Sequence, residues 1–276
     1  MNISQAVVHG CNVLTQSESP DRDSQILLCN ILSCTTVYLH SRSDQLLTEQ
    51  QRTRFEQLLQ QRQQGQPIAH LTGRSGFWTL DLHITPDTLI PRPDTELLVE
   101  LALSKIKPTM LVADLGTGSG AIALSLAQEQ PLAQFVAMDY SRSALTIAKK
   151  NAVTHQLNNV LFWQGQWLDA IADRSLDIVV SNPPYIQVDD PHLSQGDVRF
   201  EPLTALTSGV DGLDDIRKIV LQAQRCLTNT GWLLVEHGYD QAQRVKDLFQ
   251  KAGFINITSH KDLGDNDRVV MGQIEC

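Results

Sequence analysis

The tetrapeptide Asn182-Pro183-Pro184-Tyr185 carries the sharpest chemical signal in the sequence. Asn182 offers a side-chain carbonyl oxygen and Pro183 a backbone carbonyl oxygen, and two such acceptors can grip a planar NH2 group through both of its hydrogens. The prolines restrict the backbone that carries these acceptors, and the ring of Tyr185 offers a flat surface for an amide or a base. Because an amide nitrogen is a poor nucleophile, the motif favours methyl transfer to an NH2 group held in line. A β-turn or a proline-rich recognition ligand is the alternative.

A glycine-rich stretch from Asp114 to Ala121 has the composition of a nucleotide-binding turn. Glycines let the backbone approach a ligand closely, and a helix that begins there presents free N–H groups. Asp139 follows 23 residues after Gly116, where a carboxylate can accept hydrogen bonds from the hydroxyls of a ribose. The cofactor-binding residues predicted from this stretch are Gly116, Thr117, Gly118, Ser119, Gly120 and Asp139.

The glycine loop alone does not determine which nucleoside-containing cofactor binds. Gly116, Gly118 and Ala121 also satisfy the dinucleotide pattern G-x-G-x-x-G/A, which is a weak signal by itself. We expect S-adenosylmethionine, and a dinucleotide or a purely structural turn stays as an alternative.

Strands that alternate with helices must position these loops. After Pro108 the expected strands are Leu111–Asp114, Phe135–Asp139, Val160–Phe162, Asp177–Ser181, Trp232–Glu236, Ile255–Thr258 and Val269–Ile274, with helical periods between them. This order is typical of an α/β fold with a parallel, doubly wound sheet, in which ligands bind at the carboxyl ends of the strands. Residues 108–276 are therefore predicted to be a Rossmann-like catalytic domain.

The first 73 residues have a helical apolar period instead. Thr48 with Gln51 three residues later is a capping-box signature for one of these helices. We expect residues 1–73 to form a small all-helical domain that docks the substrate.

Residues 74–107 are predicted to link the two domains. An alternation with a period of two from Gly76 to Ile84 indicates a short sheet element, and three prolines between Pro86 and Glu96 indicate a stiff loop. We expect Asp94, at the end of this loop, to cap the helix that follows.

Composition limits the class of partner and the compartment. The net charge of −9 disfavours a surface that holds nucleic acid directly, since phosphate neutralisation needs clustered Lys and Arg. The five cysteines contain no C-x-x-C pair, and the eight histidines and the cysteines show no metal-ligand spacing. With no apolar run of about 18 residues and no signal peptide pattern, we expect a cytoplasmic protein without a membrane span or a metal.

Four segments together resemble the release factor glutamine methyltransferases, the PrmC or HemK family: Asn182–Tyr185, Asp114–Gly120, Ile90–Glu96 and Gln195–Pro202. The resemblance covers nearly the whole chain, including the helical N-terminal region. Asn-Pro-Pro-Tyr alone is shared with adenine N6 methyltransferases, whereas its combination with Ile-Pro-Arg-Pro is much more specific.

The resemblance implies a class I methyltransferase that uses S-adenosylmethionine. The methyl group would go to N5 of the glutamine in the Gly-Gly-Gln loop of class 1 peptide chain release factors. In this family pattern the glycine loop, Asp139 and Asn182 contact the cofactor, Trp167 lies by its adenine, and Asn182–Tyr185 receive the glutamine. This chain has Gln166 where relatives usually have an acidic residue, so Gln166 would have to accept a hydrogen bond from the adenine through its amide oxygen.

Other functions and other residues stay open at this point. An adenine N6 methyltransferase faces the same acceptor problem and can obtain its substrate by base flipping, and a module that binds S-adenosylmethionine without chemistry is a further alternative. His237, after the strand that ends at Glu236, is read as structural first. Arg92 either closes over the substrate or pairs with Glu96.

Overall fold

The computed structural model describes residues 1–275 and divides into two compact units, which are described separately below. The first unit contains Met1–Arg74 together with the distant segment His192–Phe200. The second contains Ser75–Pro191 and the residues from Glu201 onward. The stretch 74–107 therefore lies almost entirely in the second unit, and the return of His192–Phe200 to the first unit has no signal in the sequence pattern. In the described residues, no helix is long and apolar enough to cross a membrane.

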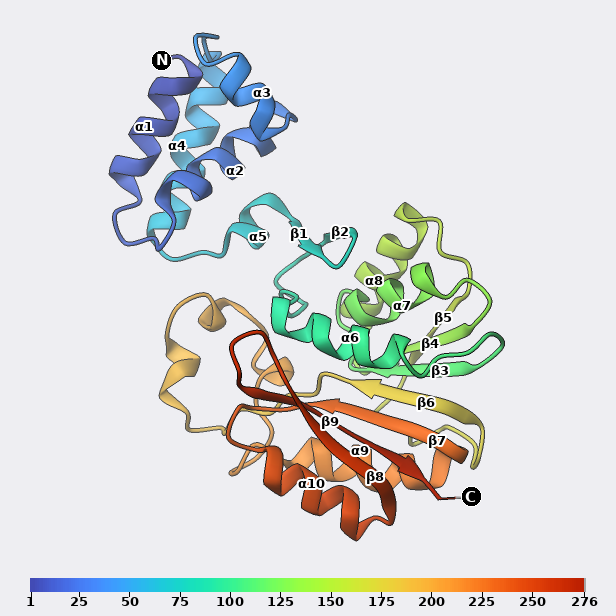
Figure 1. Cartoon of the computed structure of the whole chain (residues 1–276). Helices are drawn as coiled ribbons and strands as arrows, with labels where there is room; N and C mark the ends of the chain where they lie inside the picture. Colours follow the sequence, from blue (N-terminus) through green and yellow to red (C-terminus); the bar gives the residue numbers. More distant parts are fainter. Residues whose placement is uncertain (276) are drawn as a thin grey trace. The chain divides into compact units, whose positions relative to one another are not determined.

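Short helices build the first unit (Figure 1). Their bounds are α1 Ile3–Val13, α2 Pro20–Leu32, α3 Thr36–Ser41, α4 Glu49–Gln63 and α5 Ile68–Thr72. Capping boxes open two of them, with Asn2 and Gln5 at α1 and the expected pair of Thr48 and Gln51 at α4. The apolar faces of the helices meet in a core whose fully buried members include Ile3, Leu27, Leu28, Phe55, Leu58 and Leu59.

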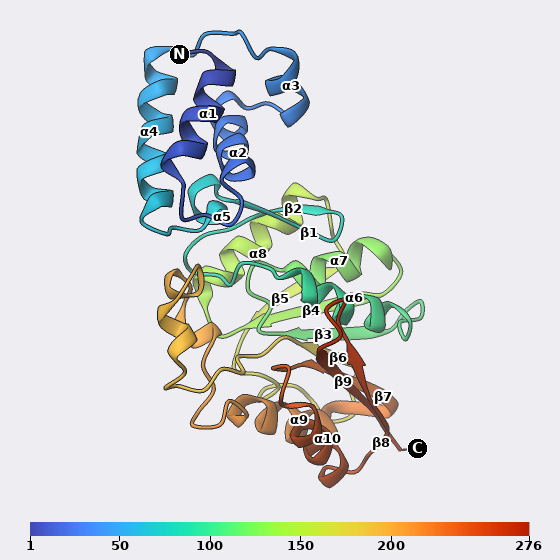
Figure 2. The ribbon, with the colours of Figure 1, turned by 60° about the vertical axis from the view of Figure 1, so that its left-hand side comes forward.

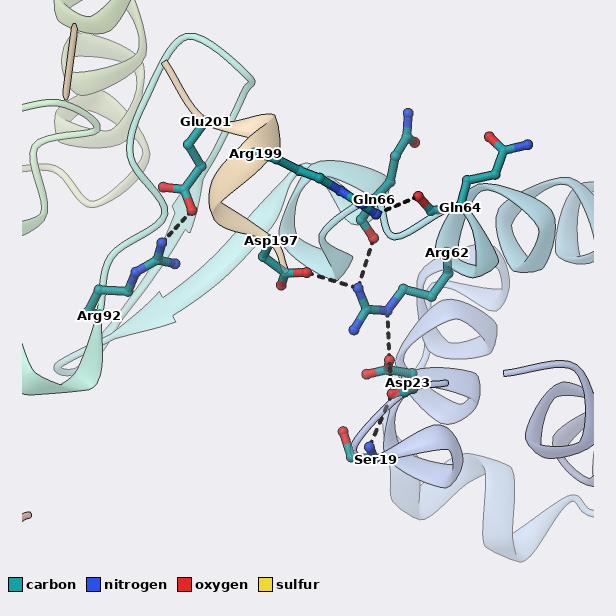
Figure 3. Close-up of polar contacts among 10 residues, drawn as sticks. Ser19, Asp23, Arg62, Gln64, Gln66, Arg92, Asp197, Arg199 and Glu201 are labelled. Atoms are coloured by element: carbon teal, nitrogen blue, oxygen red, sulfur yellow. Dashed lines mark hydrogen bonds and ion pairs between the residues drawn. The ribbon is translucent and has the colours of Figure 1, made fainter. Parts of the chain in front are cut away.

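Arg62, near the end of α4, ties the segment His192–Phe200 to the helices of the first unit (Figure 3). Its Nε donates to Asp23 Oδ2 at 2.8 Å, and its Nη1 donates to Asp197 Oδ1 at 3.1 Å. Arg199 Nη2 adds a bond to the carbonyl oxygen of Gln64 at 2.9 Å. The Arg62 and Asp23 side chains are only 16% and 7% exposed, so water competes little for this ion pair.

The second unit begins with a hairpin. β1 (Arg74–Phe77) pairs with β2 (Leu80–His83) in a sheet of two strands. The turn between them falls at Trp78, whose φ of 55° is left-handed. The alternation from Gly76 to Ile84 is therefore folded back on itself and is not one continuous strand.

The proline-rich loop enters its helix without the expected cap. Asp94 lies inside the 3-10 turn η1 (Pro93–Thr95), and α6 (Glu96–Leu103) follows with Thr95 at the N-cap and no side-chain cap bond. The prediction for Asp94 is wrong because helical backbone already begins at Pro93. Its carboxylate instead lies 3.5 Å from Nη2 of Arg268.

A sheet of seven strands forms the centre of the second unit (Figure 1), in the order β5-β4-β3-β6-β7-β9-β8. The strands are β3 Leu111–Leu115, β4 Gln134–Asp139, β5 Val160–Gln164, β6 Leu176–Ser181, β7 Leu227–Glu236, β8 Phe254–Lys261 and β9 Asp267–Ile274. The first five strands in this order are parallel, and β9 runs antiparallel to both β7 and β8. The Rossmann-like fold is confirmed, with an antiparallel pair added at one edge.

Helices cover both faces of this sheet, as Figures 1 and 2 show from two sides. The remaining helices are α7 Ala121–Glu129, α8 Arg142–Thr154, α9 Asp214–Cys226 and α10 Ala242–Lys251, and the 3-10 turns are η2 Pro191–Ser194, η3 Val198–Phe200 and η4 Leu203–Ala205. α6, α7 and α8 pack against one another and one face, while α9 and α10 pack against the other. The central strands β3 and β6 are therefore almost wholly buried, which explains their continuous apolar runs.

Asn151 on α8 holds the glycine loop and the hairpin in place. Its Nδ2 donates to the carbonyl oxygens of Ser119 at 2.8 Å and His83 at 3.1 Å, and its Oδ1 accepts from the His83 N–H at 2.8 Å. The side chain is fully buried. Water therefore cannot replace these bonds when the amide is removed.

We expect Asn151→Ala to lower the free energy of unfolding by about 2–4 kcal/mol, because it leaves several buried backbone groups without partners. Urea denaturation followed by circular dichroism measures this change. Asn158→Ala is the matched control, since the amide of Asn158 makes only an exposed bond to Gln156 and its loss should change stability by less than about 0.5 kcal/mol. Equal effects of the two substitutions would contradict the assigned role of Asn151.

Candidate functional site

The candidate site lies where β3 and β6 end side by side. These strands pair in parallel with Leu115 opposite Ser181, so the glycine loop after β3 and the Asn-Pro-Pro-Tyr motif after β6 leave the sheet at one edge. The Ser181 hydroxyl donates to the carbonyl oxygen of Leu115 at 2.8 Å and ties the two loops together. The strand order changes direction between β3 and β6, and such a switch point is where open α/β sheets bind ligands.

Two glycines of the loop are required by close approach and by backbone conformation. Gly116 has a φ of 69°, and a Cβ there would lie 3.5 Å from the Trp167 ring and 4.0 Å from the carbonyl oxygen of Asn182. Gly120 has a φ of 88°, and a Cβ would come within 2.9 Å of Leu124. The positive φ therefore favours glycine at both positions, and a side chain at Gly116 would lie at ordinary van der Waals distance from Trp167 and the acceptor motif.

Asp139 at the end of β4 is held by the loops that surround it. Its Oδ2 accepts from the Gly118 N–H at 2.9 Å, and its Oδ1 accepts from the Ser141 N–H at 2.8 Å. Burial raises the pKa of this carboxyl, while the backbone bonds from Ser141, Gly118 and Tyr140 oppose the rise. A carboxylate has about four lone-pair sites, so Asp139 keeps acceptor capacity for a pair of ligand hydroxyls.

Asp114 organises the start of the loop from inside the protein. Its Oδ2 accepts from the Thr117 hydroxyl at 2.6 Å and from the Ala123 N–H at 3.1 Å. The side chain is buried, and its Oδ1 has no hydrogen-bond partner among the described residues. Burial raises the pKa of Asp114 to about 7, and the charge of Asp139 adds to this rise. The two hydrogen bonds lower the pKa but do not cancel the rise.

Trp167 is fixed in an uncommon backbone conformation beside the loop. Its φ is 45°, a left-handed value that a bulky residue seldom adopts. The indole Nε1 donates to Asp215 Oδ1 at 3.1 Å, and Asp215 Oδ2 accepts from the Ser208 hydroxyl at 2.7 Å. These bonds keep the indole ring over Gly116.

These residues surround one cavity of about 940 Å³, within the range of about 300–1,000 Å³ that small-molecule sites occupy. Of the residues predicted from the sequence, those that line it are Gly116, Gly118, Asp139, Trp167, Asn182 and Pro184, and Gln166 lies in the same wall. Those predicted residues that do not line it are Thr117, Ser119, Gly120, Pro183 and Tyr185. Thr117 and Ser119 are buried, and the Thr117 hydroxyl donates to Asp114.

The charge of the cavity favours some ligands over others. Three carboxylates line it, those of Asp87, Asp139 and Asp215, and the lining residues include no Lys, Arg or His. A dinucleotide would bring a pyrophosphate into this acidic surrounding without a cation to pair with it. A nucleoside that carries a positive charge fits better. Among the described residues, no group of three or more His, Cys, Asp or Glu side chains could hold a metal ion.

The acceptor motif is supported from behind by buried polar side chains. Asn182 Nδ2 donates to Thr95 Oγ1 at 3.1 Å, so the amide is anchored on its nitrogen side. The Tyr185 hydroxyl donates to Glu236 Oε1 at 3.4 Å. Tyr185 thus turns its hydroxyl into the protein, and the predicted stacking of its ring against a substrate stays a prediction.

Arg92 does not make the pairing with Glu96 that the sequence left open, and its closing over the substrate stays a prediction. Its guanidinium pairs with the buried carboxylate of Glu201 (Figure 3). The same carboxylate also accepts from the Ile90 N–H at 3.1 Å. Glu96 accepts instead from the Trp78 N–H at 2.9 Å, so the pairing of Arg92 with Glu96 is wrong. Arg92 therefore fastens the proline-rich loop to the chain that leads into Pro202, Thr204 and Ala205, which line the cavity.

His237 is buried outside the cavity, in agreement with the structural role that the sequence favoured. It is fully buried, its Nδ1 contacts the carbonyl oxygen of Gly238 at 2.8 Å, and it is absent from the cavity lining. Burial lowers the pKa of its imidazole. It is therefore neutral near pH 7 and away from the reacting groups.

Sequence reasoning missed several residues that support the site. Thr95 stands inside the Ile90–Glu96 segment and Glu236 ends a predicted strand, but only tertiary contacts bring them behind Asn182 and Tyr185. Asp215 opens α9, where an acidic residue reads as ordinary helix stabilisation. The one available signal in the sequence was Glu236, a polar residue at the carboxyl end of an apolar strand.

Comparison with known proteins identifies two domains in this chain. Residues 5–73 match the family model described as PrmC N-terminal domain, and residues 93–195 match the model described as Methyltransferase small domain. Among solved structures, a methyltransferase from Pyrococcus furiosus aligns with a TM-score of 0.56 at 15% identity, over 72% of this chain and 91% of that one. A ribosomal protein L11 methylase from Lactobacillus delbrueckii aligns with a TM-score of 0.51 at 17% identity, over 69% and 82%. These two similarities concern the fold.

Curated relatives are far more similar in sequence. A release factor glutamine methyltransferase of Aliivibrio fischeri is 44% identical over 262 residues, which cover 94% of this chain and 92% of the relative. The enzyme of the same name from Escherichia coli K12 is 44% identical over 261 residues, 94% of each chain. One from Xylella fastidiosa is 47% identical over 253 residues, 91% of this chain and 92% of the relative. This chain therefore belongs to the release factor glutamine methyltransferase family.

Proposed function

We propose that this protein transfers a methyl group from S-adenosylmethionine to the side-chain amide nitrogen of a glutamine in a peptide chain release factor. The observation that carries the proposal is the placement of Asn182 in the wall of the cavity that Gly116 and Asp139 also line. An acceptor for an NH2 group and a nucleoside site thus share one space. Family membership specifies the glutamine as the source of that group.

The volume of the cavity and the charge of its lining suit S-adenosylmethionine. We assign binding of the ribose to Asp139 and binding of the methionine part to the glycine loop. Trp167 is assigned to lie beside the adenine. The three carboxylates of the cavity suit the positive charge of the sulfonium and of the amino group. When bound, this co-substrate supplies the electrophilic methyl group.

Asn182 and Pro183 perform the positioning that the acceptor nitrogen needs. The Nδ2 of Asn182 is engaged by Thr95, so its Oδ1 is left to accept a hydrogen from the glutamine NH2, and the carbonyl oxygen of Pro183 is assigned to the second hydrogen. Two acceptors fix the plane of the amide and draw electron density toward its nitrogen. The proton can leave after the methyl group has arrived, so no strong base is required.

The partner is proposed to be a class 1 release factor that presents the glutamine of its Gly-Gly-Gln loop, in the cytoplasm. The helical first unit is the proposed docking element, since it contributes no residue to the cavity. The segment His192–Phe200 begins 7 residues after Tyr185 and packs on that unit. Docking and acceptor binding are therefore joined through a short stretch of chain.

The adenine amino group of a nucleic acid is the second candidate acceptor, because the geometry around Asn182 does not itself distinguish an amide from an exocyclic amine. The net charge of −9 disfavours it. Incubation with labelled S-adenosylmethionine and either a release factor or DNA and RNA distinguishes the two. Label on glutamine of the release factor supports the proposal, and label on adenine alone overturns it.

We expect Asp139→Ala to weaken binding of S-adenosylmethionine by about 1–3 kcal/mol, since a charged acceptor for the ribose hydroxyls is lost. Isothermal titration calorimetry measures the change. Asp87→Asn is the matched control, because this exposed carboxylate lines the same cavity but holds no part of the glycine loop. If both substitutions weaken binding equally, general negative potential and not ribose recognition explains the effect.

Asn182→Ala should lower kcat by about 10²-fold or more, because an interaction with the acceptor in the transition state is removed. The affinity for S-adenosylmethionine should fall much less, and the cofactor should still raise the melting temperature of the variant. Steady-state kinetics with release factor and thermal melting test the two statements separately. A kcat near that of the wild type would show that the Asn-Pro-Pro-Tyr turn is only structural.

Deletion of residues 1–73 should raise KM for a full-length release factor at least about tenfold, equivalent to about 1.4 kcal/mol of lost docking energy. Binding of S-adenosylmethionine should persist. Arg62→Ala is the matched control, since it releases Asp197 without removing the helical surface. If Arg62→Ala alone reproduces the whole rise in KM, the helical surface is not the docking element, and unchanged KM in the deletion variant leads to the same conclusion.

A further inference from the structure

Asp215, in the first turn of α9, holds two segments that are remote from each other in the sequence. Its Oδ1 accepts from Trp167 Nε1 at 3.1 Å, and its Oδ2 accepts from the Ser208 hydroxyl at 2.7 Å. The Asp215 N–H donates in turn to Ser208 Oγ at 2.8 Å. The Asp215 side chain is only 18% exposed and Ser208 is 2% exposed, so these bonds are stronger than they would be in water. Lys218 Nζ lies 3.6 Å from Oδ1 but its side chain is 54% exposed, and such a pair contributes little.

Ser208 belongs to a segment, residues 206–213, that pairs with the chain immediately after the acceptor motif. The Ile186 N–H donates to the carbonyl oxygen of Leu206, and the Ser208 N–H donates to that of Ile186, both at 2.9 Å. The Val188 N–H donates to the carbonyl oxygen of Gly209 at 3.1 Å. A displacement of Ser208 would therefore displace the backbone that leaves the acceptor motif.

Gly212 brings the same segment against the acceptor motif itself. Its φ is 75°, and a Cβ there would come within 2.3 Å of the carbonyl oxygen of Tyr185, so no side chain fits between the two backbones. Gln241 Nε2 donates to the same carbonyl oxygen at 2.9 Å. The segment 206–213 thus supports the end of the acceptor motif, and Asp215 holds this segment through Ser208.

The other partner of Asp215, Trp167, lies on the cofactor side of the cavity. Its φ of 45° is one that a bulky residue keeps only when its surroundings hold it. Gln222, seven residues after Asp215 and on the same face of α9, accepts through Oε1 from the Leu168 N–H at 2.9 Å. Gln222 therefore holds the backbone beside Trp167, and Asp215 holds the indole ring.

We propose that Asp215 is a positioning residue for both sides of the site, which sets the Trp167 indole on the cofactor side and, through Ser208, the segment behind the acceptor motif. The inference rests on the proposed function for the identity of the two ligands. A carboxylate suits this role because both of its oxygens only accept, so it can take one donor from each side. The acceptor nitrogen must lie in line with the methyl group, and a misplacement of about 1 Å can cost about 10²-fold in rate.

The first test is a set of substitutions in the full chain. Asp215→Ala should weaken binding of S-adenosylmethionine about tenfold and, with the cofactor saturating, lower kcat/KM for a release factor about tenfold, because each side loses a bond to a charged group. Asp215→Asn keeps an oxygen for Trp167 and gains an N–H that can donate to Ser208 Oγ, so it should recover most of both losses. Calorimetry and steady-state kinetics measure the two quantities.

Asp214→Ala is the matched control. Asp214 lies in the same first turn of α9, but its side chain is 55% exposed and pairs with Arg217. Its loss removes the same charge from the start of the helix without touching Trp167 or Ser208. Both the cofactor affinity and kcat/KM should therefore remain at their wild-type values.

The second test isolates the acceptor side. Ser208→Ala should lower kcat/KM for a release factor about as much as Asp215→Ala does, while the affinity for S-adenosylmethionine changes far less. The double variant should have the same kcat/KM as Asp215→Ala, because the two residues act through one shared contact. Ser208→Ala removes a single hydroxyl, so this test still applies if thermal melting shows Asp215→Ala to be unfolded.

A third measurement does not depend on turnover. The indole N–H resonance of Trp167, assigned by its disappearance in Trp167→Phe, should exchange slowly with water in the wild type, in Asp214→Ala and in Asp215→Asn, but rapidly in Asp215→Ala. The backbone amides of Ile186 and Val188 should follow the same pattern. If the wild type methylates no release factor while this pattern holds, the proposed function fails and the positioning role of Asp215 stands.

Three results would overturn this role. The first is wild-type cofactor affinity and kcat/KM in Asp215→Ala, and the second is an Asp215→Asn variant as impaired as Asp215→Ala, which would make negative charge the cause. The third is an acceptor side that does not depend on Ser208. It would appear as wild-type kcat/KM in Ser208→Ala, as additive losses in the double variant, or as unchanged exchange at Ile186 and Val188 in Asp215→Ala.

Discussion

The parallel pairing of β3 with β6 is the interaction on which the site depends. It places Leu115 opposite Ser181, so two loops that are more than 60 residues apart in the sequence leave the sheet at the same point. Because the helices that follow these strands pack on different faces, the space above the switch point is not filled by either crossover. The glycine loop forms one wall of that space and Asn182 the other. Cofactor and acceptor are therefore brought together by sheet register and not by local sequence.

Buried carboxyl groups give this edge of the sheet its rigidity. Asp114, Asp139 and Glu236 each lie at or next to the last residue of a strand, and each accepts hydrogen bonds from the loops beside it. Removing a carboxylate from water is costly, and burial raises the pKa of all three groups. That cost is offset by bonds that fix the backbone of the glycine loop and the side chains behind the acceptor motif. The buried carboxyl groups therefore lower the stability of the fold, but they hold the hydrogen-bond acceptors in a fixed arrangement.

The acidic character of the site and the absence of cations from its lining have one physical consequence. Electrostatic attraction in a partly enclosed cavity is stronger than in water, so a positively charged co-substrate is favoured over a phosphate-bearing one that would otherwise use a similar glycine loop. The chain between Tyr185 and Pro202 adds a second constraint, since it is fastened to the first unit by Arg62 and to the proline-rich loop by Arg92.

The sequence by itself determined the strand and helix order, the capping box at Thr48, the glycine loop and Asn182, because each depends on local periodicity or on residues close in the chain. It did not determine the antiparallel edge strands, the hairpin at Trp78 or the 3-10 turn at Asp94, since pairing direction and backbone angles there are set by packing. Nor could it place Thr95 behind Asn182, Glu236 behind Tyr185, or Arg62 beside Asp197. These partners lie 87, 51 and 135 positions apart, and a contact across such separations exists only once the tertiary structure has formed.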